Sequence, residues 1–421
     1  MNKKVLFILS SWLILIAGLY SCNQDELSFT VKNNLDTIRY DEPVVIHKSE
    51  LDMFSAGEGE IPFVFDESGN IIPFQLDDMN RDGEWDELFF LADFDSAGEK
   101  KYMIKPGSPE NMPVFKKRTN LRMGRVLKKG EEYDEVKTAS RLSGANTTAT
   151  SDSFQFEGPG WENDKIAFRN YFDARNGIDI FGKKVSYMVL DSVGIYNNYH
   201  EMQAWGMDIL KVGNSLGAGA IALKTNDSIY RIAPGARGSF ELLTEGPLRS
   251  VFQLSFHDWM IGEIQLGIVH QITIVAGEHG YRSKVWVKGA GADVNICTGV
   301  VNMQSDTVYH LTPNKKYDAM YTHARQSYLE EFLGMGILFP SGQFSAYGEA
   351  PTEGEGIVQT YLVELKQEGS KPYEYCFFGG WEKANQEFAA REDFEKYLTG
   401  KADRLAAPLE VAMNANTAGA N

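Results

Sequence analysis

Short apolar or alternating runs separated by turn residues fill the region up to about residue 105. Residues 61–65 alternate, and the turn residues 66–70 follow them, which is the pattern of a β-hairpin with one buried face. Pro and Gly punctuate the chain at 106–109, which suits a boundary. These features predict an N-terminal β-unit over residues 29–106. The other runs of this kind are 29–32, 43–47, 71–76, 88–92 and 101–105.

From residue 122 onward strand patterns recur and helical periodicity is scarce. Only 385–405 has large apolar residues at helical spacing, which predicts an amphipathic helix broken by Gly400. Many strands without alternating helices favour a sandwich or barrel over a doubly wound parallel sheet. The strand-like runs are 166–172, 187–190, 218–223, 250–256, 270–275, 283–287, 334–339 and 360–364.

The fold class expected from these patterns is all-β, as a large antiparallel β-sandwich. The sandwich is expected over residues 115–412, with the amphipathic helix near its C-terminal end. Residues 413–421 have nothing to bury, so we expect a disordered tail.

The first residues carry the pattern of a bacterial lipoprotein signal. Lys3 and Lys4 precede an almost wholly apolar run at 5–19, and Ser21 stands before Cys22 as a small residue at a cleavage site. The apolar run is short for a bilayer, which asks for about 20 apolar residues. A true transmembrane helix is the alternative.

This pattern predicts a signal peptide at residues 1–21, a lipid on Cys22 and a tether at 22–28. The anchor would hold the protein in the outer membrane, facing the periplasm or the cell surface. Acidic residues at 23–26 resemble the surface-export signal of lipoproteins from glycan-degrading Gram-negative bacteria.

Composition supports a β-rich protein and limits its partners. The chain has 25 Phe, 19 Tyr and 40 Gly against 14 Pro, a mixture that favours strands and tight turns. Its formal charge of -17 would repel a polyanion, so no nucleic-acid partner is expected. Beyond Cys22 only Cys297 and Cys376 remain, and the spacing does not decide whether they pair.

An acidic segment at 77–87 copies the opening of a calcium loop. Asp78, Asn80 and Asp82 offer alternating oxygen donors, and Gly83 allows a sharp turn. The twelfth position of an EF-hand is not acidic here, so Asp86 or its neighbour would complete the shell. A structural Ca²⁺ is one interpretation, and a water-solvated turn is the other.

Charged and aromatic residues are interleaved between residues 158 and 184. If 166–172 is a strand, Arg169 lies on the same face as every second residue of that strand. Arg169 and Arg175 are candidates to bind a substrate carboxylate, because the planar guanidinium group matches a carboxylate. The alternative is that both arginines form ion pairs with Glu162, Asp173 and Asp179.

The Gly-rich segment 200–219 holds the remaining candidates for catalysis. His200 is a candidate proton carrier, with Asp208 or Lys211 as its partner, and Trp205 is a candidate to stack on a sugar ring. A structural histidine and a core tryptophan are the alternatives. The segment lacks the Gly-Lys-Ser/Thr ending of a phosphate loop.

The other histidines are scattered and show no zinc-ligand spacing. His257 follows a strand and His323 is a candidate to face a cleft, although a structural role is the commoner fate of such residues. Zinc-hydrolase chemistry therefore receives no support.

Several segments together resemble an uncharacterised lipoprotein family of glycan-degrading bacteria. Such proteins look similar to the galactose-mutarotase-like supersandwich, a fold shared with carbohydrate-active enzymes and polysaccharide lyases. The resemblance spans most of the mature chain and implies a context of uronate degradation. Its markers are residues 75–91, Gly158-Pro159, 169–184, 205–213, 246–250 and Gly380-Trp381-Glu382.

Two function classes follow. As an enzyme, the protein would act on an acidic oligosaccharide by elimination or hydrolysis, with His200 as proton carrier. As a binding module, it would capture the glycan without turnover. The substrate-binding candidates are Arg169, Arg175, Trp205, His257, His323 and Trp381.

Overall fold

The computed structural model describes residues 26–51, 59–126, 131–144, 152–225, 228–232, 235–291 and 294–413. The predicted signal peptide, Cys22 and the tail at 414–421 lie outside these residues. Within the described ranges, no helix combines the length and apolar character needed to cross a membrane. The predicted tether ends earlier than expected, because strand β1 (Leu27–Lys32) already begins at Leu27.

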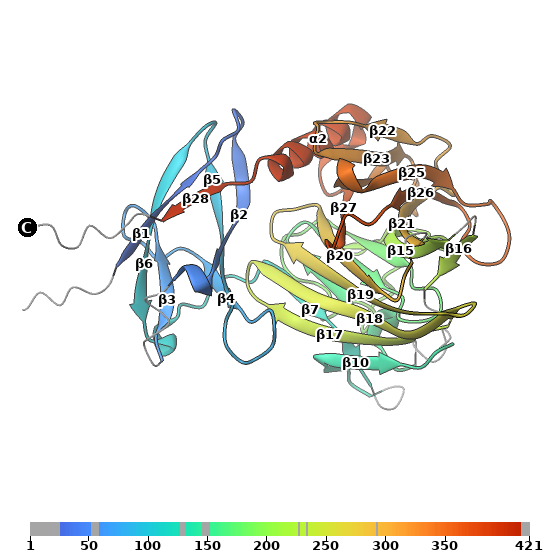
Figure 1. Ribbon diagram of the computed structural model, residues 1–421, viewed down its shortest axis with the longest axis horizontal. Helices are drawn as coiled ribbons and strands as arrows, with labels where there is room; N and C mark the ends of the chain where they lie inside the picture. Colours follow the sequence, from blue (N-terminus) through green and yellow to red (C-terminus); the bar gives the residue numbers. More distant parts are fainter. Residues whose placement is uncertain are drawn as a thin grey trace, which may run out of the picture.

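The N-terminal unit is a small sandwich of two antiparallel sheets (Figure 1). Its core contains Phe29, Phe90 and Tyr102, whose rings pack within 6.2 Å of one another. One sheet has the order β28 (Glu410–Met413), β1, β6 (Glu99–Gly107) and β3 (Ile61–Phe65). The other has the order β2 (Arg39–His47), β5 (Glu87–Phe94) and β4 (Phe74–Asp77).

The predicted hairpin after residue 65 is present. Phe65 pairs with Ile71, and the Asp66 carboxylate accepts the backbone N–H groups of Ser68 and Asn70 at 2.9 Å each. Side-chain caps of this kind are why Asp is favoured in tight turns.

The last strand of the chain corrects the predicted domain boundaries. β28 pairs with β1, so Phe29 lies opposite Met413, and residues 410–413 belong to the N-terminal unit. This unit is therefore built from both ends of the chain rather than from 29–106 alone.

The larger unit is a sandwich in which one nine-stranded sheet faces two five-stranded sheets (Figure 1). All pairs between named strands are antiparallel. The nine-stranded sheet has the order β10 (Thr138–Arg141), β17 (Arg237–Glu245), β18 (Arg249–Ile261), β19 (Ile264–Val275), β20 (Gly280–Lys288), β27 (Tyr373–Trp381), β24 (Leu333–Pro340), β23 (Tyr317–Ala324) and β22 (Tyr309–Leu311).

The two five-stranded sheets lie side by side against it. The first has the order β14 (Gly206–Asp208), β13 (Ile178–Lys183), β12 (Ile166–Asn170), β11 (Gly160–Asn163) and β7 (Thr119–Arg122). The second has the order β16 (Ser228–Arg231), β15 (Ala218–Thr225), β21 (Val294–Val301), β26 (Thr360–Leu365) and β25 (Phe344–Glu349). A short two-stranded sheet joins β8 (Gly124–Arg125) to β9 (Asp134–Glu135).

Large aromatic side chains fill the space between the sheets. The Phe168 ring on β12 lies 5.6 Å from Trp161 and 4.9 Å from Tyr281, which stands on the nine-stranded sheet. Because alternate residues of a strand point to opposite faces, Arg169 must then point out of this core. Core packing by Phe168 therefore sets the direction of the neighbouring arginine.

Helix α2 (Arg391–Ala406) covers the outer face of β23 and β24. Its buried residues Phe394 and Leu398 face that sheet, as the helical spacing predicts. The predicted break at Gly400 is wrong, because the helix runs through it. The predicted start is early by several residues, because 386–389 form a 3-10 turn.

The fold class expected from the sequence is confirmed. The described chain is mostly antiparallel β-sheet with one helix near the C-terminal end. Cys297 and Cys376 do not pair; both are free and buried, on β21 and β27, and burial raises the pKa of each thiol to about 12.

Candidate functional site

Three neighbouring strands of the first five-stranded sheet bring Arg169, Asp179 and Asp208 to one face. Arg169 on β12 lies directly opposite Asp179 on β13, and Asp208 on β14 lies opposite Phe181. Asp179 and Phe181 are two residues apart and share a face, so Asp208 joins the same row. This face is turned away from the aromatic core, and the segment 184–205 covers it.

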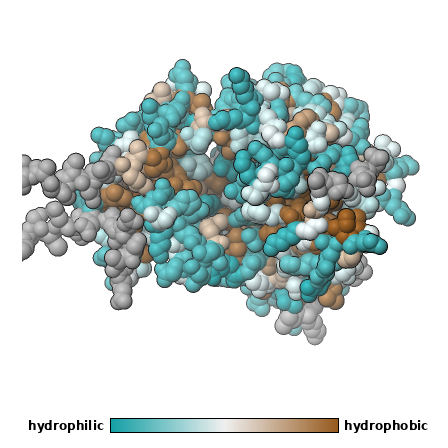
Figure 2. All heavy atoms as spheres, viewed as in Figure 1, coloured by the Kyte–Doolittle hydropathy of each residue, from teal (hydrophilic) through white to brown (hydrophobic). Residues whose placement is uncertain are grey.

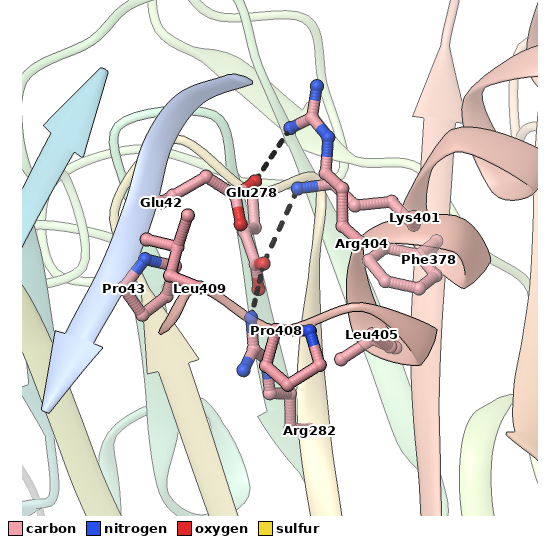
Figure 3. Close-up of a pocket in the computed structure, with 10 residues that line it drawn as sticks. All are labelled: Glu42, Pro43, Glu278, Arg282, Phe378, Lys401, Arg404, Leu405, Pro408 and Leu409. Atoms are coloured by element: carbon pink, nitrogen blue, oxygen red, sulfur yellow. Dashed lines mark hydrogen bonds and ion pairs between the residues drawn. The ribbon is translucent and has the colours of Figure 1, made fainter. Parts of the chain in front are cut away.

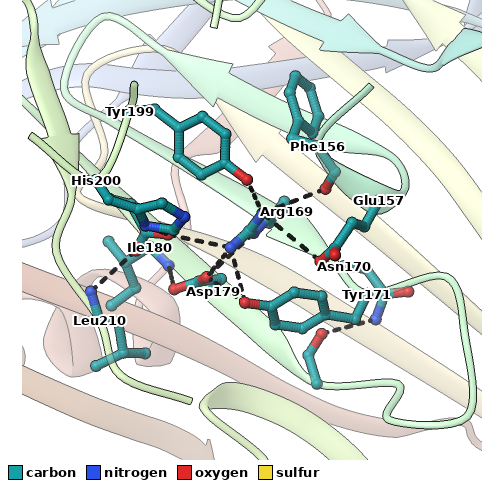
Figure 4. Close-up of polar contacts among 12 residues, drawn as sticks. Phe156, Glu157, Arg169, Asn170, Tyr171, Asp179, Ile180, Tyr199, His200 and Leu210 are labelled. Carbon is teal, nitrogen blue, oxygen red and sulfur yellow. Dashed lines mark hydrogen bonds and ion pairs between the residues drawn. The ribbon is translucent and has the colours of Figure 1, made fainter. Parts of the chain in front are cut away.

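Arg169 is the residue to which the other polar side chains of this face are hydrogen-bonded (Figure 4). Its guanidinium donates to Asp179 at 2.7 Å and to Asp208 at 3.0 Å. It also donates to the hydroxyl oxygens of Tyr171 at 2.7 Å and Tyr199 at 3.0 Å. We call these five residues the Arg169 cluster.

The cluster corrects the expectation that Arg169 meets a substrate carboxylate. Arg169 is 2% exposed, and both terminal nitrogens already donate within the protein. The alternative drawn from the sequence, a cross-strand ion pair with Asp179, is what forms.

Two carboxylates share one guanidinium in the cluster, and this favours retention of a proton. Burial, and then the charge of Asp208, raise the pKa of Asp179 to about 7 against the opposing effect of Arg169. The Tyr171 hydroxyl donates to the same Asp179 oxygen at 2.9 Å. A buried carboxyl with a pKa in this range is able to hold or release a proton near neutral pH.

His200 connects the cluster to solvent. Its Nδ1 lies 3.3 Å from Asp208 Oδ2, and its side chain is 49% exposed. The hydrogen bond that His200 donates to Asp208 raises the pKa of His200 more than partial burial lowers it. An accessible imidazole held by a buried carboxylate is the arrangement that general acid–base catalysis uses.

Arg175 also forms ion pairs within the protein, which is the alternative drawn from the sequence. Its guanidinium is therefore not free to bind a substrate carboxylate. Its guanidinium donates to Asp173 at 2.6 Å and to Glu157 at 2.9 Å, and it lies 3.7 Å from the centre of the Tyr171 ring. It is half-buried at the border of the Arg169 cluster.

Trp205 and Lys211 flank the cluster without entering it. Trp205 is half-buried and packs edge-on against Phe181 at 6.2 Å, in the apolar layer between segment 184–205 and the sheet. Lys211 is exposed and follows Leu210, whose backbone N–H donates to Asp208 at 3.3 Å. Lys211 lines a small pocket with Met303, Gln326 and Met335, and this pocket does not include His200.

Three predicted substrate-binding residues lie elsewhere. His257 is exposed on β18, opposite Arg237. The Nε2 atom of His323 lies 2.9 Å from the Phe388 carbonyl oxygen under helix α2. Trp381 is 2% exposed and fills the space beside Gly182, so it is a core residue.

The acidic loop at 78–86 is held by its own hydrogen bonds. Asp78 accepts the backbone N–H of Gly83 at 2.9 Å, and Asp86 accepts that of Asn80 at 3.0 Å, while Asn80 accepts that of Asp82 at 2.8 Å. Among the described residues, no group of three His, Cys, Asp or Glu side chains is placed to hold a metal ion. Calcium binding by this loop stays a prediction.

Sequence reasoning missed the two tyrosines of the cluster. Tyr171 stands two residues after Arg169 and Tyr199 immediately before His200, so local spacing was the available signal for both. Their roles depend on segment 184–205 folding back over the sheet, which strand alternation does not reveal.

Comparisons with known proteins place the chain in a family. The model of a domain of unknown function, DUF4861, matches residues 31–411. An uncharacterized protein, P7, of Formosa agariphila is 26% identical over 406 residues, covering 91% of this chain and 92% of that protein.

Solved structures with some likeness have low sequence identity. An α-mannosidase from Enterococcus faecalis V583 is 9% identical with a TM-score of 0.48; the match covers 94% of this chain and 47% of the mannosidase, so the chain spans about half its length. A putative aldose 1-epimerase from Klebsiella pneumoniae is 8% identical with a TM-score of 0.31, covering 72% of this chain and 100% of the epimerase. By the match over residues 31–411, the chain belongs to the DUF4861 family of unknown function.

Proposed function

We propose that this protein is a carbohydrate-active lipoprotein that processes an acidic oligosaccharide, with His200 as the proton carrier. The observation that carries the proposal is the half-exposed imidazole of His200, held 3.3 Å from the buried carboxylate of Asp208. Asp208 is fixed in turn by Arg169, so the imidazole is both accessible and oriented.

The reaction class that suits this arrangement best is elimination next to a uronate carboxyl group. His200 would take the proton from the carbon α to that carboxyl group. The released electron pair would form a carbon–carbon double bond as the β carbon–oxygen bond breaks, and the leaving oxygen would take a proton from His200 or water. Hydrolysis would use the same residue as a general acid or base.

Exposed groups around His200 offer contacts for a sugar. Lys211, which is exposed three residues after Asp208, is a candidate cation for a carboxylate, a role that the buried Arg169 does not fill. Tyr196 on segment 184–205 is 79% exposed, and Tyr328 is 49% exposed with its N–H bound to the Ile209 carbonyl oxygen. Aromatic faces of this kind stack on the apolar faces of sugars.

The decisive experiment compares wild-type protein with His200→Ala on pectin, alginate and glycosaminoglycan fragments. Turnover is followed by absorbance of unsaturated uronate and by new reducing ends. We expect a loss of about 10²–10⁴-fold in the variant, the usual contribution of a general acid or base. His257→Ala is the matched control, because His257 is exposed on a different sheet. Equal turnover by wild type and His200→Ala would remove His200 from the mechanism.

Glycan binding without turnover is the second candidate. It is favoured by the internal ion pairs of the Arg169 and Arg175 guanidiniums, which hold both side chains in place without a substrate. Retention of every fragment intact, with measurable binding of one of them, would select this function.

Membrane anchoring through Cys22 is part of the proposal. It is supported by the residue pattern before Cys22. Metabolic labelling with a radioactive fatty acid should label the wild-type protein and leave Cys22→Ala unlabelled. Equal labelling of both would reject lipidation at this position.

A further inference from the structure

A cleft separates helix α2 from the N-terminal unit, and its lining shares no residue with the Arg169 cluster. It has a volume of about 700 Å³, within the range of about 300–1,000 Å³ typical of small-molecule sites. Its walls come from the turn before β20, the turn between β11 and β12, helix α2 and residues 35–37. We call it the junction cleft. Figure 2 shows a hollow in the viewed face of the molecule where the two units meet.

One wall of the junction cleft is made of aromatic rings. His279 lies edge-on to Phe388 at 4.9 Å and to Tyr397 at 5.8 Å. The Tyr397 hydroxyl accepts the backbone N–H of His279 at 3.0 Å, which fixes the ring of the tyrosine. Burial, with the charges of Lys165 and Lys401, lowers the pKa of His279 to about 3. Its imidazole is therefore neutral at pH 7 and offers one donor and one acceptor.

Four cationic side chains line the cleft, and two of them already form ion pairs with carboxylates. Lys401 lies 3.4 Å from Glu278, and Arg404 lies 3.0 Å from Glu42 on β2 (Figure 3). Glu278 also binds Arg282 at 2.6 Å, so the network beside the cleft joins both units to helix α2.

The other two cations are Lys165 and Lys396. Lys165 is exposed in the turn between β11 and β12, and Lys396 is exposed on α2. Within the described parts of the chain, neither ammonium lies within ion-pair distance of a carboxylate.

The remaining wall offers groups that bind hydroxyls. Asp393 stands in the first turn of α2 and Thr399 in its third, and Asp36 lies across the cleft on the N-terminal unit. Acceptors and donors arranged around aromatic rings suit a polyhydroxylated ligand, because each hydroxyl both donates and accepts.

We propose that the junction cleft binds an anionic saccharide of one or two rings, with its acidic group between Lys165 and Lys396 and its hydroxyls on the facing carboxylates and His279. This site goes beyond the proposed function, since it shares no residue with the Arg169 cluster. A ligand held there contacts both units and so links them.

Calorimetric titration of the full chain tests the proposal with matched sugars: glucuronate against glucose, and galacturonate against galactose. We expect at least one acid to bind at least ten times more tightly than its neutral counterpart. In the Lys165→Gln/Lys396→Gln double variant, that affinity should fall at least tenfold. Lys288→Gln is the control, because Lys288 ends β20 about 26 Å along the strand from the cleft.

Two further measurements keep this test separate from the catalytic one. The His279 imidazole signals in an NMR spectrum should shift when the acid binds, and the affinity read from these signals should be the same in wild type and His200→Ala. Equal affinity for acid and neutral sugar, unchanged affinity in the double variant, or no binding by any of the four sugars would overturn the proposal.

Discussion

The Arg169 cluster and the network beside the junction cleft use the same residue types in opposite proportions. In the cluster, one guanidinium serves two buried carboxylates, Asp179 and Asp208. Beside the cleft, one buried carboxylate, Glu278, serves two cations, Arg282 and Lys401. The first arrangement raises the pKa of a buried acid, and the second lowers it.

The pKa values of the two acids express this difference. Burial and Asp208 raise the pKa of Asp179 to about 7. At Glu278, burial also acts upward, but the charges of Arg282 and Lys401 outweigh it and lower the pKa to about 2. Burial alone therefore does not decide how a carboxyl titrates; the count of neighbouring charges does.

Removal of the central cation should break the cluster with the largest effect on stability. Arg169→Met leaves two buried carboxylates without their counter-charge, which costs about 3–5 kcal/mol in the free energy of unfolding. Urea denaturation measures the loss. Arg237→Met is the control, because its ion pair with Asp258 is largely exposed and contributes about 0–1 kcal/mol. Similar losses in both variants would refute the buried network.

The two acids should give opposite pH dependences of stability. The folded-state pKa of Asp179 lies above its ordinary value, so its contribution to stability falls as pH rises from about 4 to about 7. The folded-state pKa of Glu278 lies below its ordinary value, so its contribution is present above about 4.5 and is lost as pH falls toward 2.

Difference curves isolate these contributions. The free energy of unfolding of wild type minus that of Asp179→Asn should fall as the pH rises from 4 to 7. The same difference with Glu278→Gln should slope upward between pH 3 and 5. Slopes of the same sign in both curves would contradict the contrast between the two regions.

The acidic loop at 78–86 offers a smaller effect that concerns neither region. If the loop binds Ca²⁺, the ion at 100 times its dissociation constant stabilises the protein by about 2.7 kcal/mol. Thermal unfolding with calcium and with a chelator measures this, and Asp82→Asn should abolish the difference. Identical melting temperatures with and without calcium would leave the loop as a self-contained turn.

The smallest effect is expected at the unpaired lysines of the junction cleft. The Lys165→Gln/Lys396→Gln double variant should change the free energy of unfolding by no more than about 0.5 kcal/mol per substitution, as surface changes do. Denaturation in urea checks this. A loss of several kcal/mol in the free energy of unfolding would mean that the two lysines stabilise the fold and are not free to bind a ligand.

Strand alternation and turn chemistry were enough to predict the fold class and the hairpin after residue 65. They also brought Arg169 under consideration, whereas Asp179 entered as its possible ion-pair partner and Asp208 as a possible partner of His200. The sequence left open whether Arg169 faces solvent, because a strand was expected at 187–190 and the covering segment 184–205 contains none. The pairing of β28 with β1 was also missed. The two strands lie nearly 400 residues apart in the sequence, and local patterns carry no information about such a distant pair.

The junction cleft was beyond prediction from the sequence. Lys165, His279 and Lys396 come from three distant segments, and each looks ordinary in its own surroundings. Trp381 shows the converse, because a motif that looked functional supplies a core side chain packed on Gly182. Local patterns predict which groups a strand presents, but long-range packing decides which of them meet.

Carbon-13 NMR titration of the side-chain carboxyl groups, with Asp179→Asn and Glu278→Gln spectra for assignment, tests the contrast most directly. The account predicts that Asp179 titrates near pH 7 and Glu278 near pH 2 in the same folded protein. Titration of both groups near pH 4 would contradict it.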